Sequence, residues 1–228
     1  MSFLGVRGVE GVCLVMNKIA IYGAGGFGRE VYCLIQKINA VAPQWDVIGF
    51  FDDGKPKGDP VGRYGSVLGG AADVNAWREP LAVVIAVGST GNRKRIVSEI
   101  GNPAITFPNI IHPEVVYADE SSILMGKGNI VQRGSAFSCD VEVGDFNVFN
   151  GSVLGHDVAL GSYNVLMPAV RISGSTTVGD SNFFGIGSIV LQGKTIGNGI
   201  TLGAGSVLIQ NPKDGKLYVG NPARLMKF

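Results

Sequence analysis

The chain has 228 residues, of which 46% are hydrophobic and 16% are charged, and its formal net charge at pH 7 is +1. Such a balance, with no basic stripe and no acidic tail, argues against a polyanion as partner, so we expect no nucleic-acid binding. No apolar run reaches the roughly eighteen residues of a membrane span, so we expect no membrane partner either.

The first fifteen residues are apolar but contain Arg7 and Glu10. Two charges inside the stretch argue against the hydrophobic region of a signal peptide. We interpret residues 1–15 as a leader or upstream extension, with Met16 as the natural start of the protein.

Cysteine and histidine are scarce. Three cysteines lie far apart and form no CxxC pair, namely Cys13, Cys33 and Cys139. This usage predicts a reduced, cytoplasmic setting. The only histidines are His112 and His156, which is too few for the three imidazoles of a solenoid zinc site, so we expect no metal.

A glycine-rich loop follows the first predicted strand. The strand is KIAIY at residues 18–22, and the loop is GAGGFG at residues 23–28. A helix with one apolar face is predicted next, from the spacing of Val31, Leu34, Ile35 and Ile38. Glycines in this context let a phosphate approach the backbone at a helix N-terminus. The alternative is that they only allow close packing of the strand against the helix.

Two further strands extend this unit. The second, at residues 47–51, ends in Asp52 and Asp53, where a Rossmann half places an acid that binds a ribose or base. The third, at residues 81–87, ends in Gly88 and precedes a predicted helix at residues 93–100. We therefore predict a Rossmann-like βαβαβ domain at residues 16–107. It is half a dinucleotide fold, which favours a nucleotide-linked ligand over NAD.

Apolar residues recur at every sixth position in the second half of the chain. Eleven positions share this phase: Val148, Leu154, Leu160, Leu166, Ile172, Val178, Phe184, Val190, Ile196, Leu202 and Leu208. Three such segments close one coil with the aliphatic side chains inside, so the period predicts a parallel β-helix of hexapeptide repeats over residues 108–228. Hexapeptide proteins wind left-handed, and we expect the same here.

The six-residue register is less regular before residue 148. Leu124, Ile130 and Ala136 keep the six-residue step, whereas Val143 is offset by one residue. We therefore predict a bulge or an irregular corner near Val143.

His156 is the main catalytic candidate. It replaces a small residue at a predicted corner of the solenoid and is followed by Asp157. Imidazole is the most frequent general base near neutral pH, and an adjacent carboxylate orients the ring and favours its protonated form. Because neighbours on a strand point to opposite faces, the two side chains meet only if the corner bends. No Ser or Cys is paired with His156, which favours direct attack by the substrate, and His112 reads as a structural residue of the linker.

Together these motifs resemble the bacterial sugar-nucleotide acetyltransferases of the PglD/NeuD-like type. The resemblance rests on the loop at 23–28, FFDD at 50–53, IAVG at 85–88, GHD at 155–157, the repeats, and VGNPAR at 219–224. It implies an acetyl-CoA-dependent N-acetyltransferase that acts on the amine of a nucleotide-activated amino sugar. It also implies a homotrimer with acetyl-CoA bound between neighbouring solenoids.

The resemblance assigns roles to individual residues. On the catalytic side, His156 would be the base, Asp157 would tune it, and the Gly174 amide would donate to the thioester oxygen. On the acceptor side, the matching positions are Gly25, Gly26 and Phe27 for the diphosphate and sugar, Asp52 and Asp53 for the uracil or ribose, and Gly88 for the wall of the pocket. On the CoA side they are Val165, Ile186 and Ala204.

Three positions depart from the family pattern. Phe27 and Val165 stand where well-studied members have histidine, and Asp157 stands where some have glutamate. Phe27 removes a hydrogen-bond donor, so the identity of the sugar stays open. The nucleotide base and the acetylated position are open as well. O-acetylation of sialic acid and a non-catalytic nucleotide-sugar-binding trimer remain alternatives at this point.

Overall fold

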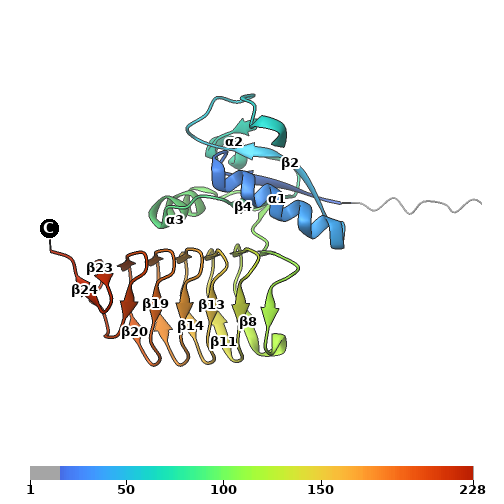
Figure 1. The fold of residues 1–228 in the computed structure, drawn as a ribbon. Helices are drawn as coiled ribbons and strands as arrows, with labels where there is room; N and C mark the ends of the chain where they lie inside the picture. Colours follow the sequence, from blue (N-terminus) through green and yellow to red (C-terminus); the bar gives the residue numbers. More distant parts are fainter. Residues whose placement is uncertain (1–15, 228) are drawn as a thin grey trace, which may run out of the picture.

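The computed structural model describes residues 16–227, which form a parallel sheet with three α-helices and a long β-helix (Figure 1). The interpretation of residues 1–15 as a leader concerns residues outside this range. None of the helices in the described range is long and apolar enough to span a bilayer.

The N-terminal sheet has five parallel strands in the order β3-β2-β1-β4-β5. In chain order its elements are β1 (Asn17–Tyr22), α1 (Gly26–Val41), β2 (Trp45–Phe51), β3 (Val67–Gly69), α2 (Ala71–Asn75), β4 (Leu81–Ile85), α3 (Thr90–Glu99) and β5 (Ile105–Thr106). The predicted strands correspond to β1, β2 and β4. β3, α2 and β5 were not predicted, because they are too short to show a period in the sequence.

The buried face of α1 is the predicted one. Val31, Leu34, Ile35 and Ile38 are all buried, and β4 is buried along its whole length. Each fully buried aliphatic side chain contributes roughly 1.5–3 kcal/mol of transfer free energy, so this layer holds the loop at 23–28 on a rigid base.

The rest of the chain is a β-helix with three faces. Face 1 consists of β6 (Ile110–Ile111), β9 (Ile130–Val131), β12 (Val148–Phe149), β15 (Val165–Leu166), β18 (Phe183–Phe184), β21 (Thr201–Leu202), β23 (Leu217–Gly220) and the antiparallel β24 (Ala223–Leu225). Face 2 consists of β7 (Val116–Tyr117), β10 (Ala136–Phe137), β13 (Val153–Leu154), β16 (Arg171–Ile172), β19 (Ile189–Val190) and β22 (Val207–Leu208). Face 3 consists of β8 (Ile123–Met125), β11 (Val141–Val143), β14 (Ala159–Leu160), β17 (Thr177–Val178) and β20 (Thr195–Ile196).

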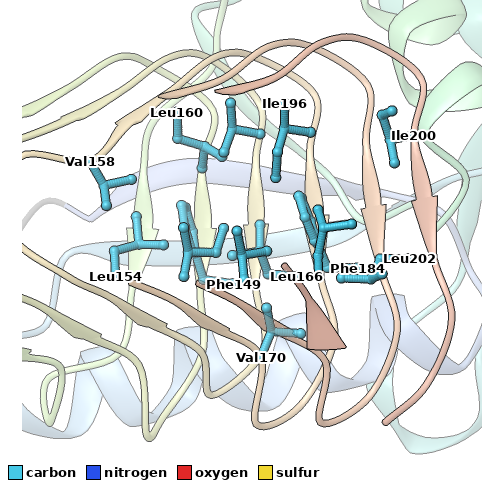
Figure 2. Packing of buried hydrophobic residues seen from close by; sticks show 14 of the residues in the cluster. Phe149, Leu154, Val158, Leu160, Leu166, Val170, Phe184, Ile196, Ile200 and Leu202 are labelled. Atoms are coloured by element: carbon cyan, nitrogen blue, oxygen red, sulfur yellow. The ribbon is translucent and has the colours of Figure 1, made fainter. Parts of the chain in front are cut away.

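The six-residue period describes the core of this solenoid. The ten in-phase positions from Leu154 to Leu208 all belong to one buried cluster inside the coils (Figure 2). Strands in consecutive coils pair in parallel, for example Leu154 with Ile172 and Ile172 with Val190. The predicted fold class, a Rossmann-like sheet followed by a left-handed parallel β-helix, is confirmed.

The register predicted before residue 154 was wrong by one residue. Phe149 points into the solenoid core, whereas Val148 packs in the cluster that contains residues of α1. Val131, Phe137 and Val143 share the phase of Phe149 and are also in the core.

The three residues assigned to the core in that register lie outside it. Leu124 is 64% exposed, Ile130 packs with the α1 cluster, and Ala136 is partly exposed. The irregular step is therefore the five-residue corner between Phe149 and Leu154, not a bulge near Val143.

The N-terminal domain covers face 1. Ile110, Ile130 and Val148, all on face 1, share a buried cluster with Leu34 and Ile38 of α1. Figure 1 shows that α1 runs along the solenoid, with its C-terminal end over the first coils and its N-terminal end over later ones. The glycine-rich loop is thereby fixed above the middle of the solenoid.

Candidate active site

His156 and Asp157 form a hydrogen-bonded pair at the corner between face 2 and face 3. The His156 Nδ1 atom lies 2.7 Å from Oδ2 of Asp157, and the two side chains are 50% and 60% exposed. Asp157 has a φ of 55°, a left-handed conformation that turns the chain and brings the adjacent side chains together. Since a carboxylate accepts the proton of Nδ1, the lone pair of the neutral ring is on Nε2.

Gly174 lies directly against the ring of His156 in the next coil. A Cβ atom at position 174 would be only 2.6 Å from Nε2 of His156. The Gly174 carbonyl accepts a hydrogen bond from Gly193, but within residues 16–227 its N–H has no acceptor. One corner therefore combines the imidazole of His156 with a buried amide donor that has no acceptor within the described residues, and acyl transfer to a nucleophile uses two groups of this kind.

The residues expected on the CoA side do not lie at this corner. Ile186 is 54% exposed and Ala204 is exposed, and both lie at the corner between face 1 and face 2 in successive coils. Val165 is 2% exposed, and its N–H donates to the Asn182 carbonyl within the ladder of face 1. In the protomer, neither the side chain nor the N–H of Val165 is available to a ligand.

The glycines of the loop at 23–28 divide into two kinds. Gly23 has a φ of 113°, and a Cβ at Gly28 would lie 1.8 Å from the Gly23 carbonyl oxygen, so these two are needed for backbone packing. Gly25 and Gly26 are exposed, and a Cβ at either would have no neighbour closer than 4.0 Å. Phe27 is half-buried in the α1 cluster. Close packing and an open backbone surface for a ligand are thus both built into this loop.

Asp52 and Asp53 shape the ends of the strands around this loop. Asp52 accepts hydrogen bonds from the N–H groups of Ala24 (2.8 Å) and Gly54 (2.9 Å). Its carboxylate is thereby tied to the glycine-rich loop itself.

Asp53 accepts a hydrogen bond from the Tyr22 hydroxyl at 2.7 Å and another from the Ala71 N–H at 2.9 Å. Burial, reinforced by Asp53, raises the pKa of Tyr22 well above its ordinary value. Asp53 therefore anchors the start of α2 to β1, and Nη2 of Arg95 on α3 lies 4.0 Å from its Oδ2 atom.

Two further groups lie near the glycine-rich loop, at the ends of the strands that surround it. Gly88 is exposed and a Cβ there would touch nothing, so the backbone at the end of β4 is open. Lys55 donates from Nζ to the Ala24 carbonyl at 3.1 Å, which places a cation beside the loop. Lys55 was not among the predicted site residues, although a lysine two residues after the paired acids is a signal that the sequence contains.

In one protomer the loop and His156 lie on opposite sides of the solenoid. The loop belongs to the domain that covers face 1, whereas His156 lies at the corner that joins faces 2 and 3. The two halves of the predicted site are therefore not adjacent within a single chain. Within residues 16–227, no three His, Cys, Asp or Glu side chains come together as a metal would require.

His112 is buried at the junction between α1 and the first coils, where it lines a cleft of about 400 Å³ together with Lys37 and Arg133. Its Nδ1 accepts a hydrogen bond from the Glu114 N–H at 3.0 Å. Burial lowers the pKa of His112 below its ordinary value, against an opposing contribution from Glu114. Its position fits the structural role expected from the sequence.

This burial predicts a pH dependence of stability. The unfolded chain binds a proton at His112 more readily than the folded chain, so the free energy of unfolding falls as pH drops through and below about 6.5. His112→Asn keeps an acceptor for the Glu114 N–H but removes the titration. We expect the fall in Tm between about pH 7 and about pH 5 to be smaller in this variant than in the wild type, and equal falls would contradict this account.

Residues 16–227 thus combine a Rossmann-like domain, a β-helix of hexapeptide repeats and a His-Asp pair at a corner of the solenoid. Residues 18–100 match the family model of the PglD N-terminal domain. The chain is 28% identical over 221 residues to GDP-perosamine N-acetyltransferase from Escherichia coli, covering 93% of this chain and 97% of that protein.

Two solved structures resemble the whole chain. The acetyltransferase domain of PglB from Neisseria gonorrhoeae, in complex with acetyl coenzyme A, has a TM-score of 0.81 and 26% identity, covering 93% of this chain and all of that one. PerB from Caulobacter crescentus, in complex with CoA and GDP-perosamine, has a TM-score of 0.81 and 29% identity, covering 93% and 99%. The chain is homologous to these PglD-like sugar acetyltransferases, which confirms the resemblance seen in its motifs.

Proposed function

We propose that the protein transfers the acetyl group of acetyl-CoA to the amine of a nucleotide-linked amino sugar, with His156 as general base. The observation that carries this proposal is the corner where Nδ1 of His156 is held by Asp157 and the ring lies against Gly174. It is supported by the similarity to GDP-perosamine N-acetyltransferase and to structures that hold CoA, acetyl-CoA or GDP-perosamine.

The reaction requires one proton to move twice. The amine nitrogen attacks the thioester carbon while Nε2 of His156 takes a proton from the nitrogen, and the Gly174 N–H donates to the oxygen that becomes negative. The carbon–sulfur bond then breaks, and the imidazolium returns the proton to the departing CoA sulfur. Asp157 stabilises the imidazolium in between, and no covalent acyl-enzyme is formed.

The acceptor side of the site is assigned to the edge above α1. Gly25 and Gly26 offer exposed backbone at a helix N-terminus for the diphosphate, and we assign Phe27 and the exposed Gly88 to the same acceptor site. The carboxylates of Asp52 and Asp53 each accept two hydrogen bonds within the fold. We assign them to the ribose or base, which they would contact through their remaining lone pairs.

We further propose that the site is completed in a homotrimer. His156 and the glycine-rich loop lie on opposite sides of one solenoid, and Ile186 and Ala204 lie at another corner than Gly174. Contact between the His156 corner of one subunit and the face 1–face 2 corner of its neighbour would bring three parts together: the base, the residues assigned to CoA, and the glycine-rich loop. Val165 then serves only to pack face 1.

Charge is distributed unevenly along the solenoid, which supports an orientation of acetyl-CoA. Residues 108–157 contain seven acidic and two basic side chains, whereas residues 158–227 contain two acidic and six basic ones. Because CoA has three phosphate groups remote from its thiol, we propose that its nucleotide end lies toward the C-terminal coils.

The proposal predicts which acceptors are acetylated. GDP- and UDP-linked amino sugars, the corresponding hydroxyl sugars and free sialic acid are each incubated with acetyl-CoA, and thiol release and product mass are measured. We expect turnover with at least one nucleotide-linked amino sugar and none with its hydroxyl counterpart. Turnover of sialic acid alone would replace the proposal with O-acetylation, and no thiol release from any acceptor would favour a non-catalytic scaffold.

A further inference from the structure

Arg93 is a buried cation without an anionic partner. Its side chain on α3 is 1% exposed, and burial lowers its pKa to about 10, so it is charged at neutral pH. The guanidinium donates to two backbone carbonyls, from Nη2 to Val87 and from Nη1 to Phe146 at 3.2 Å. Its Nε has no acceptor, and no carboxylate within residues 16–227 forms an ion pair with it.

Such an arrangement is unfavourable for the protein alone. Burial of a charge is compensated when a countercharge and hydrogen bonds replace its hydration, and two neutral carbonyls supply only part of this. A positive potential therefore persists around Arg93, and it is screened less inside the protein than at the surface.

The charge lies behind the edge of the proposed acceptor site. Arg93 holds the carbonyl of Val87, the residue before the exposed Gly88. On its other side Val87 packs against the glycine-rich loop, because a Cβ at Gly23 would be 3.4 Å from Val87 Cγ2. The N-termini of α1 and α3 begin at this same edge, so their dipoles add to the positive potential.

Arg93 also connects this edge to the solenoid. Phe146, whose carbonyl it binds, belongs to a corner of the β-helix and stacks on Tyr163 with ring centroids 5.4 Å apart. The segment Val87–Gly88 is therefore fixed to the solenoid through one guanidinium.

We propose that Arg93 is a positioning residue that supplies, from within the fold, the countercharge for the diphosphate of the nucleotide-linked acceptor. This inference rests on the proposed function. The charge of Arg93 would increase the affinity for a nucleoside diphosphate but not the affinity for a nucleoside, which has no phosphate groups.

The test is a set of calorimetric binding titrations of the full-length protein with guanosine, GDP, uridine and UDP. For Arg93→Met we expect affinity for the diphosphate that binds the wild type to fall about tenfold, while affinity for its nucleoside changes less than about twofold. Arg93→Lys, which keeps the charge, should retain most of the diphosphate affinity. Lys18→Met is the matched control: it removes an exposed cation of the same domain that is paired with Glu79 at the start of β1, the end of the strand opposite the glycine-rich loop, and should change neither affinity.

The outcomes separate this inference from the proposed function. Equal losses of nucleoside and diphosphate affinity in Arg93→Met would show a purely structural role, and no loss would remove the countercharge. If Arg93→Met does not fold, the Arg93→Lys variant decides. This variant keeps the charge, so a loss of its affinity for the diphosphate but not for the nucleoside would overturn the inference. If no nucleotide binds the wild type, the proposed acceptor class fails first, and the inference fails with it.

Discussion

Replacing His156 by alanine is expected to lower kcat/KM by at least about a hundredfold, the usual contribution of a general base. The side chain is 50% exposed and lies outside the solenoid core, so its removal should leave Tm and acetyl-CoA affinity nearly unchanged. Steady-state kinetics with the amino-sugar acceptor, together with thermal unfolding and CoA titration, measures the three quantities. A variant with nearly wild-type kcat/KM would remove His156 from the mechanism.

A methyl group at Gly174 is expected to have an effect of similar size without removing any catalytic group. The Cβ of Gly174→Ala would lie 2.6 Å from Nε2 of His156, so the ring must turn away from the position where its lone pair is presented. Because the ring is the mobile end of an exposed side chain, stability should change little while kcat falls about a hundredfold.

Two controls accompany Gly174→Ala. Ser175→Ala alters the adjacent residue of the same corner without adding an atom near His156, and should retain activity. The double variant Gly174→Ala/His156→Ala should be no slower than His156→Ala alone, since both changes disable one group. Full activity in Gly174→Ala would mean that the ring position seen here is not the one used in catalysis.

The solenoid could be predicted from sequence because its core obeys one period. Ten positions from Leu154 to Leu208 repeat every six residues, and all of them are in the core. The phase failed before residue 154 because both neighbours, Val148 and Phe149, are apolar and both are buried, one against α1 and the other inside the coils. A sequence pattern cannot distinguish these two kinds of burial.

The candidate site was predictable where a residue breaks a rule. His156 stood out as a large polar residue at a corner, and the φ of 55° at Asp157 explains how it meets its neighbour, which the sequence could not indicate. The hydrogen bond from the Ala71 N–H to Asp53 depends on α2, an element too short to predict. Arg93 was not recognised because an arginine next to Lys94 and Arg95 in a polar helix looks like a surface residue.

The site also depends on how the two domains sit on one another. The sequence placed the glycine-rich loop and His156 in one mechanism, and the structure places them on opposite sides of one solenoid. This separation follows from the packing of α1 on face 1, a contact between distant segments that no local pattern contains.

A single-turnover experiment measures whether His156 promotes transfer of an acetyl group to a sugar amine. Enzyme in excess is mixed with isotopically labelled acetyl-CoA and the nucleotide-linked amino sugar and quenched over time, for the wild type and for His156→Asn. We predict that the wild type places the label in an amide of the sugar, and that His156→Asn does so at least about a hundredfold more slowly. Transfer at equal rates, or label recovered only as free acetate, would contradict the account.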